Sequence, residues 1–522
     1  MRLLHFASRP DDTHLLRMPV SASPSLSSIL ALVLFTTLIG GCAPDSTSNG
    51  DAPTSHPAAL ALDGAFDEWN SIPELVRDSI GDGGETDVQS LSMAHDDEYL
   101  FVSFRLNAAL TLQQDNDLTL ALDLDADEST GNADGADLTW TFGERNGTYY
   151  GPSTTELGHA DLGFASLPTV SSNQYEIALR RAATPGQSEW LTTGDTVCAV
   201  LESQTDRAPD TGRVCYKLTE GPSNVNDGPV ELERAPETQV RVISHNVLQD
   251  TLFTAPVRNA YERIYRTVEP DVYALQEIYD HEAEVTRTRI AELTDTDATE
   301  WHTAKLGLDL VVVSRFPILG THTIPGFEDY ESGAYLLDTN QEMGHPLLLI
   351  NMHPPCCTGG EPTSDLKRQR VVDAVVAFLR DTHEDGGPLD VPTDTPILIV
   401  GDMNFVGDAQ QPASLADGGI LNTSLFGDAS APDWDGSPLL DINPSQTGAP
   451  LHTTWENADS SFPPGRLDYA YLSDSVAEVK RAYTLSTSQL PDSVRTAYGL
   501  KKEDTARASD HLPLVIDISS DD

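Results

Sequence analysis

The stretch Ile397-Leu-Ile-Val-Gly-Asp-Met-Asn-Phe405 decides the fold of the second half of this chain. Four apolar residues followed by a glycine are typical of a short buried strand that stops at a turn. Because side chains alternate along an extended segment, Asp402 and Asn404 are expected to point the same way, with Met403 turned into the protein. The alternative is an ordinary turn after a core strand, which Gly-Asp-x-Asn also suits. On the first interpretation, a rigid strand end presents a carboxylate beside an amide, which is an active-site layout.

The same scheme, in which an apolar strand leads to a polar residue, recurs through the second half of the chain. Strands of this kind are expected at 240–247, 272–277, 308–315, 347–353, 397–404, 467–472 and 511–518. Apolar residues at spacings of three and four predict helices at 257–268 and 366–379. Strands and helices that alternate in this way, with some connections of hairpin length, predict an α/β fold built on two sheets rather than a parallel barrel.

Polar side chains with catalytic or ligand chemistry stand at the ends of these expected strands. They are Asn246, Glu277, His353, Asp402, Asn404, Asp468, Asp510 and His511. Cleavage of a phosphate ester needs an oriented water, a cation that neutralises the phosphate oxygens, and hydrogen-bond donors that follow the charge into the transition state. Hard oxygen ligands suit Mg²⁺, or Mn²⁺ in its place. Glu277 is the first candidate ligand, with Asn246 and Asp510 beside it.

Taken in order, and with Ser314-Arg-Phe-Pro-Ile318 between them, these motifs resemble the endonuclease/exonuclease/phosphatase superfamily, whose fold is deoxyribonuclease I-like. The resemblance extends over residues 238–519. It implies a four-layer α/β/β/α sandwich and a divalent-metal-dependent hydrolase of phosphate esters. We expect phosphodiester hydrolysis, by a nuclease or by a phosphodiesterase acting on phospholipids or sugar phosphates.

The resemblance also implies a role for each catalytic candidate. Asp402 orients and deprotonates the attacking water, while Asn404 and His353 contact the phosphate. His511 stabilises the developing charge and is held by Asp468. A histidine whose tautomer is fixed by a carboxylate is what such a role requires.

Residues 60–220 show a different pattern, in which alternating strands are separated by Gly and Asp turns. This pattern predicts an antiparallel β-sandwich of binding type, followed by a linker at 221–237. Leu118, Leu120, Leu122 and Leu124 share one face of an expected strand. An acidic loop follows, and its carboxylates suit Ca²⁺, although an ordinary solvated acidic loop is the alternative. The candidate calcium ligands are Asp123, Asp125, Asp127 and Asp137.

Three motifs of this region resemble the carbohydrate-binding family nine and DOMON-type sandwich modules. They are Leu62-Asp-Gly-x-x-Asp-x-Trp69, Asp96-Asp-x-Tyr99-Leu, and the Asp-x-Asp loop with Thr130-Gly131. The resemblance implies a binding domain, often with structural calcium, for which carbohydrate is the expected partner.

The amino terminus carries three arginines ahead of an apolar run at 29–39, which is too short to span a bilayer and ends in Ile39-Gly-Gly-Cys42. This arrangement resembles a bacterial lipoprotein signal peptide. It implies that residues 1–41 are removed, that Cys42 carries lipid, and that 42–59 form a flexible tether. We therefore expect an exported protein anchored to the cell envelope, at the outer membrane.

The chain of 522 residues has a formal charge of −51. Residues 43–237 hold 35 acidic and 9 basic side chains and residues 238–522 hold 45 and 19, so each half carries −26. Even acidity argues against a broad nucleic-acid-binding face. The length suits two domains, the second being 238–522, and we expect a monomer.

Exported proteins usually oxidise their cysteines, and four remain if Cys42 is acylated. Cys198 and Cys215 flank an expected hairpin and are paired on that ground. Cys356 and Cys357 are then left to each other, with free thiols as the alternative.

A competing function from another class is a non-catalytic sugar-binding or adhesion lipoprotein. The intact set of candidate ligands favours the metal-dependent hydrolase.

Overall fold

The computed structural model describes residues 53–84, 86–187, 189–224, 230–357, 363–384 and 386–521. The predicted signal peptide and Cys42 lie outside these residues. Residues 53–522 form one compact unit. None of the helices in the described ranges has the length and apolar character needed to cross a membrane. Thr54 and Pro57, which the sequence places in the tether, pair with Tyr216 and His95 of the sandwich.

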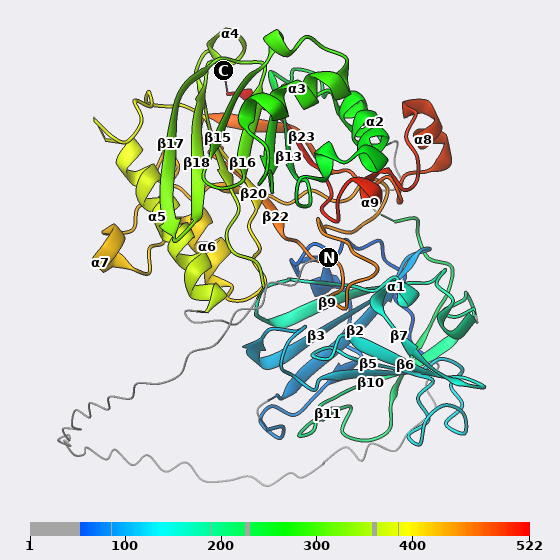
Figure 1. Cartoon of the computed structure of the whole chain (residues 1–522). Helices are drawn as coiled ribbons and strands as arrows, with labels where there is room; N and C mark the ends of the chain where they lie inside the picture. The colour runs from blue at the N-terminus through cyan, green and yellow to red at the C-terminus, as the bar shows by residue number, and fades with distance from the viewer. Residues whose placement is uncertain are drawn as a thin grey trace, which may run out of the picture. The chain divides into compact units, whose positions relative to one another are not determined.

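The amino-terminal part is an antiparallel sandwich of two sheets (Figure 1). The five-stranded sheet runs β1 (Val76–Arg77), β2 (Val88–His95), β3 (Tyr99–Leu110), β9 (Ser172–Arg180) and β8 (Ala165–Leu167). The seven-stranded sheet runs β11 (Arg207–Ala208), β10 (Thr196–Glu202), β4 (Thr119–Asp123), β5 (Leu138–Thr141), β6 (Asn146–Tyr150) and β7 (Thr154–Leu157), with β12 (Val214–Lys217) also paired to β10. The short helices are η1 (Glu68–Ser71), α1 (His159–Leu162) and η2 (Pro185–Gln187).

Alternation along the strands explains the core of this sandwich. Leu118, Leu120 and Leu122 are at most 1% exposed and pack in one core, as their spacing predicts. The disulfide between Cys198 and Cys215 joins facing positions of β10 and β12, which confirms that pairing.

The carboxyl-terminal part contains two six-stranded sheets. The first runs β15 (His302–Leu306), β16 (Leu310–Ser314), β14 (Val272–Gln276), β13 (Val240–Asn246), β24 (Leu514–Ser520) and β23 (Ala477–Thr484). The second runs β17 (Ile318–Phe327), β18 (Tyr330–Leu337), β19 (Leu347–Met352), β20 (Ile397–Asp402), β22 (Asp468–Leu472) and β21 (Leu440–Ile442).

Helices cover the outer face of each sheet (Figure 1). Those on the first sheet are α2 (Arg258–Val268), α3 (Ala283–Thr294), α8 (Asp492–Tyr498) and α9 (Asp504–Ala508). Those on the second are α5 (Ser364–Thr382), α6 (Gln410–Asp417) and α7 (Thr423–Phe426). Shorter helical segments are η3 (Thr251–Phe253), η4 (Ala255–Val257), η5 (Ala298–Glu300) and α4 (Asn340–Met343).

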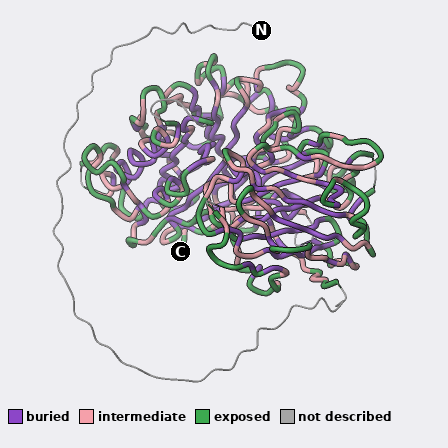
Figure 2. The backbone as a smooth tube through the Cα atoms, turned by 90° about the horizontal axis from the view of Figure 1, so that it is seen from below, coloured by how far each residue is buried: buried purple, intermediate pink, exposed green. Residues whose placement is uncertain are grey.

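Successive strand residues face two different cores, and this produces the four layers. Val242 and Leu398 lie in the core between the two sheets. Ile243 packs on the helices of the first sheet and Ile399 on those of the second. In Figure 2 the buried segments lie inside and the exposed segments outside. The α/β/β/α sandwich expected from the sequence is therefore confirmed. One residue of the predicted helix 366–379 does not lie on its buried face: Leu366 is 63% exposed.

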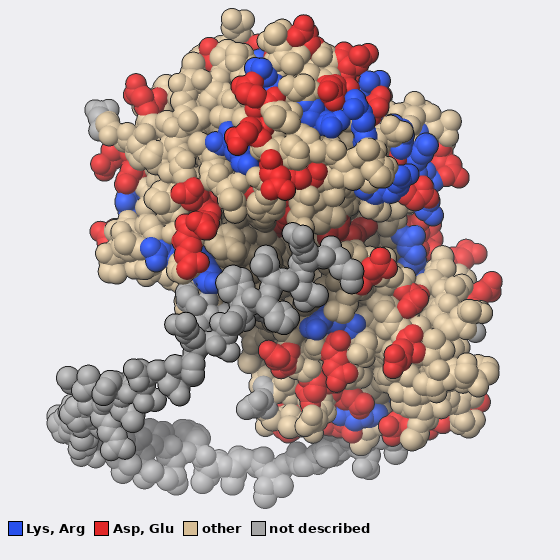
Figure 3. Space-filling view, in the orientation of Figure 1, with Lys and Arg blue, Asp and Glu red and all other residues tan. Residues whose placement is uncertain are grey.

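The surface is acidic, with basic side chains interspersed. On the face drawn in Figure 3, carboxylates are spread widely and the basic groups lie among them. Arginines of α2 and α3 are paired with nearby glutamates. The pairs are Arg258–Glu292, Arg266–Glu262 and Arg287–Glu284.

A buried ion pair fastens the first sheet. Arg241 and Asp517 face each other on β13 and β24, and their side chains are 2% and 1% exposed. The guanidinium donates to both carboxylate oxygens, at 2.6 and 2.8 Å. It also donates to the carbonyl oxygens of Leu232 and Val268. The charge is thus compensated within the fold.

Replacing Asp517 should test this compensation. Asp517→Ala leaves a buried guanidinium without its counter-charge and is expected to lower the free energy of unfolding by about 3–5 kcal/mol. Glu292→Ala, which breaks exposed pairs, should cost less than about 1 kcal/mol. Urea denaturation of both variants measures the difference, and equal costs would contradict the assignment.

Candidate active site

The strand order brings the predicted residues to one edge. Asn246 ends β13 and Glu277 follows β14, and these strands are parallel neighbours in the first sheet. His353 follows β19 and Asp402 ends β20, which are parallel neighbours in the second. Asp402 also faces Asp468 across β20 and β22. Residues far apart in the sequence meet because parallel strands end at the same side of a sheet.

Asp402 lies at the centre of the site and is 2% exposed. Its Oδ2 accepts hydrogen bonds from the side-chain amides of Asn246, at 3.0 Å, and Asn404, at 3.1 Å. The same oxygen lies 3.5 Å from Nε2 of His353 and 3.5 Å from Nε2 of His511. Burial raises the pKa of Asp402, while the two histidines lower it.

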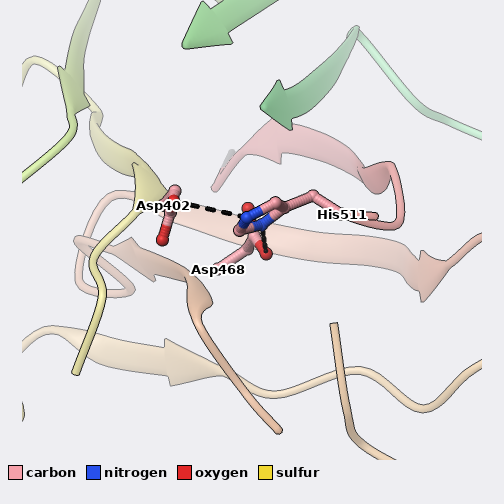
Figure 4. A group of neighbouring side chains, drawn as sticks. All are labelled: Asp402, Asp468 and His511. Carbon is pink, nitrogen blue, oxygen red and sulfur yellow. Dashed lines mark hydrogen bonds and ion pairs between the residues drawn. The ribbon is translucent and has the colours of Figure 1, made fainter. Parts of the chain in front are cut away.

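His511 is held by a carboxylate of its own. Its Nδ1 lies 2.8 Å from Oδ2 of Asp468, which leaves Nε2 directed at Asp402 (Figure 4). Burial lowers the pKa of His511, but Asp468 and Asp402 outweigh it and raise the pKa to about 10. Both ring nitrogens therefore face carboxylates, Nδ1 that of Asp468 and Nε2 that of Asp402. The pairing of His511 with Asp468 is the one that the sequence predicts.

His353 is held in the same manner by Asp309, a residue that the sequence interpretation missed. Nδ1 of His353 lies 2.6 Å from Oδ2 of Asp309, and that carboxylate also accepts from the backbone N–H of Glu277, at 2.9 Å. Burial lowers the pKa of His353, but Asp309, Asp402 and Glu277 raise it to about 9. The signal available was an acid just before an apolar strand, since β16 begins at Leu310 and not at 308.

The backbone at Asn404 turns and is not extended, although the sequence predicts an extended segment there. Its φ is 51°, in the left-handed region, so the chain turns here instead of continuing as a strand. Its backbone N–H donates to Oδ1 of Asp402 at 3.1 Å. Met403 is buried in the core, as predicted. The two polar side chains thus meet through a tight turn rather than through strand alternation.

Arg368 of α5 holds the loop after His353 through hydrogen bonds to its backbone. This side chain is fully buried and donates to the carbonyl oxygens of Pro355 and Cys357, at 3.0 and 2.8 Å. Because it is buried, this arginine supports the loop from inside the fold instead of lying in solvent. Cys356 and Cys357 in this loop are bonded to each other.

The predicted metal ligands include one oxygen that lacks a partner. Oδ1 of Asp510 is buried without a hydrogen-bond partner among the described residues. Glu277 accepts from Asn246 and from the backbone of Gln249. An unpaired buried carboxylate oxygen suits a divalent cation. The amide nitrogen of Asn246, and not its oxygen, faces Glu277.

A second group of oxygen and nitrogen atoms also meets the spacing of a metal site. Ligand atoms of Asp402, Asp468 and His511 lie within 4.8 Å of one another. Both nitrogens of His511 already face carboxylates, so this histidine has no free nitrogen to offer to a metal ion in this arrangement.

The acidic loop of the sandwich gathers three of its four predicted calcium ligands. Oxygens of Asp123, Asp125 and Asp137 lie within 4.8 Å of one another. Asp127 is exposed and accepts from Ser129 instead. Calcium binding there stays a prediction.

Comparison with known proteins identifies a family for the second half of the chain. The model of the Endonuclease/Exonuclease/phosphatase family matches residues 243–511. A comparison with curated proteins found no significant match.

Solved structures that align with about half of the chain include three enzymes. D. rerio TDP2 complexed with single strand DNA product shares 16% identity, covers 54% of this chain and 98% of its own, and has a TM-score of 0.34. Sphingomyelinase C from Streptomyces griseocarneus shares 15% identity, with an alignment that covers 53% of this chain and 98% of the sphingomyelinase chain and a TM-score of 0.33. AP endonuclease LMAP from Leishmania major shares 13% identity, with an alignment that covers 54% of this chain and 88% of the endonuclease chain and a TM-score of 0.32. On the family match, which spans more than half of its residues, this chain belongs to the Endonuclease/Exonuclease/phosphatase family and is a hydrolase of phosphate ester bonds.

Proposed function

We propose that this protein is a divalent-metal-dependent phosphodiesterase. The observation that supports it best is a row of alternating acids and imidazoles. It runs Asp309, His353, Asp402, His511 and Asp468. Such a row places one carboxylate that can take a proton between two imidazoles that can donate one.

The three central members of this row act directly in hydrolysis. Asp402 accepts the proton of the attacking water. Nε2–H of His353 and Nε2–H of His511 donate to phosphate oxygens as negative charge develops there. Asn404 keeps the carboxylate of Asp402 in place. A cation bound by Glu277 with Asp510 and Asn246 would neutralise charge on the phosphate.

Charge favours a diester over a monoester as substrate. The site carries five carboxylates, against two imidazoles, and neither lysine nor arginine is among its named members. These acids are Glu277, Asp309, Asp402, Asp468 and Asp510. A phosphodiester brings one negative charge and a monoester up to two, so repulsion is weaker for the diester. A nuclease and a phospholipid or sugar phosphodiesterase both fit this preference.

We also propose that the enzyme is exported and anchored to the bacterial envelope through lipid on Cys42. The charged amino terminus, short apolar run and Gly-Gly-Cys sequence support this. The sandwich would then be a carbohydrate-binding module next to the enzyme, which acts as a monomer. Fractionation of cells producing wild type and Cys42→Ala tests the anchor.

Removing the proposed base should abolish turnover. Asp402→Asn keeps size and most hydrogen bonds, yet it cannot take a proton, so kcat on bis-nitrophenyl phosphate should fall about 100-fold or more. The exposed acid Asp408 gives a charge-matched control, because Asp408→Asn should leave kcat unchanged. EDTA should stop the wild type. Turnover that survives both EDTA and Asp402→Asn would refute the proposal.

The metal assignment predicts a change in magnesium dependence. Glu277→Gln removes a carboxylate ligand, so the Mg²⁺ concentration for half-maximal rate should rise about 10-fold or more. Glu282→Gln, at an exposed position shortly after it in the chain, serves as the control. A Mg²⁺ titration identical to that of the wild type would remove Glu277 from the ligand set.

Asp309 should act as a positioning residue for His353. Asp309→Asn retains an acceptor for Nδ1–H but loses the negative charge, and kcat should fall about 10- to 100-fold while KM changes little. Asp280→Asn changes the same charge at an exposed position and should have no such effect. If KM rises while kcat is kept, Asp309 serves substrate binding and not catalysis.

A further inference from the structure

A group of carboxylates outside the active site lies where the two sheets of the sandwich meet. Asp78 and Asp82 belong to the loop between β1 and β2, and Asp206 to the turn between β10 and β11. Each offers one carboxylate oxygen, and these three oxygens lie within 4.8 Å of one another. The group therefore bridges the five-stranded and the seven-stranded sheet.

Asp78 is the member that most needs a partner. It is 8% exposed, and its Oδ2 is buried without a hydrogen-bond partner among the described residues. Burial raises the pKa of Asp78, and the nearby carboxylates of Asp210, Asp206 and Asp82 raise it further. A hydrogen bond from the backbone of Ser79 opposes this rise but leaves Oδ2 without a donor. A buried carboxylate oxygen without a donor is costly, and three more acids around it increase that cost.

The space beside this group is polar and large enough for a hydrated ion. A cavity of about 350 Å³ is lined by Asp82, Glu202, Asp206 and Asp210 among others. The base in its lining, Arg207, lies 3.5 Å from Glu202 and donates to the carbonyl oxygen of Pro209. The arginine that lines this cavity is therefore paired with Glu202 and not with a carboxylate of the group.

The loop that carries Asp82 is shaped to approach the turn that carries Asp206. A Cβ on Gly83 would lie 2.9 Å from Cβ of Asp206, and one on Gly84 would lie 2.8 Å from Thr205. Only glycine permits such an approach. Asp87 holds the loop in this position by accepting from the backbone N–H of Gly83 at 2.9 Å. The carboxylates are thus placed before any ion arrives.

The acidic group of Asp123, Asp125 and Asp137 differs because it contains an ion pair. Asp123 is its most buried member, and it is already paired with Arg213. No ion pair joins a lysine or arginine of the described residues to Asp78, Asp82 or Asp206.

We propose that Asp78, Asp82 and Asp206 bind one Ca²⁺ ion that ties the two sheets together at this edge. Three carboxylates from two loops and room for water suit Ca²⁺, which takes six to eight oxygens in flexible geometry. Mg²⁺ fits less well, because it demands near-ideal octahedral geometry and usually takes one or two carboxylates. The site serves stability of the sandwich and is independent of catalysis.

Calorimetric titration of the full-length protein with Ca²⁺, in saturating Mg²⁺ to fill the catalytic site, measures this binding. Wild type should bind Ca²⁺ and gain thermal stability from it. The double variant Asp78→Asn/Asp82→Asn should bind at this site at least about 10-fold more weakly, because ligand charge sets the affinity of such sites. It should also lose the rise in Tm while keeping wild-type turnover of bis-nitrophenyl phosphate.

Two single variants complete the design. Asp82→Asn alone changes an exposed residue, so its weaker Ca²⁺ binding would support the site even where the double variant fails to fold. Asp125→Asn, in the other acidic loop, should leave this binding event and the rise in Tm intact. The proposal is overturned if wild type binds no Ca²⁺, if Asp82→Asn binds as the wild type does, or if Asp125→Asn alone removes the effect.

Discussion

A buried carboxylate held between two imidazoles is the interaction on which the rest of the active site depends. An ionised carboxylate that is 2% exposed is stable only with close donors, and Asp402 has amides from Asn246 and Asn404 besides its two histidines. Each imidazole in turn needs a negative partner to stay protonated when buried. Asp309 and Asp468 are therefore as necessary to the charge balance as Asp402 is.

This row of charges crosses between the two sheets. Asp309 and His511 belong to the first sheet, where they precede β16 and β24. His353, Asp402 and Asp468 belong to the second. The apolar core between the sheets must consequently hold them in one register, because a small slip would separate both histidines from a partner. Fold and chemistry are coupled through that core.

Sequence patterns predicted most of this arrangement for a physical reason. Apolar strands that end in polar residues mark both the sheets and the edge where the site forms, so Glu277 and Asp402 were identifiable. His511, which precedes its strand, was identifiable through the family resemblance. Asp309 was not, because it stands before its strand and its partner follows another. The left-handed backbone of Asn404 and the burial of Arg368 depend on tertiary contacts, which no local pattern contains.

Acidity has different consequences in the two halves of the chain. With 82 acidic and 31 basic residues, most carboxylates have no basic side chain to pair with. A buried carboxylate, by contrast, needs a positive charge or a hydrogen-bond donor nearby to remain ionised. In the catalytic half the imidazoles supply it to Asp402, whereas around Asp78 the neighbours are further acids. A carboxylate that is both buried and unpaired is stable only if it is protonated or meets a cation from solution. The calcium site proposed for the sandwich and the metal site proposed for the enzyme both follow from where this acidic chain buries its carboxylates.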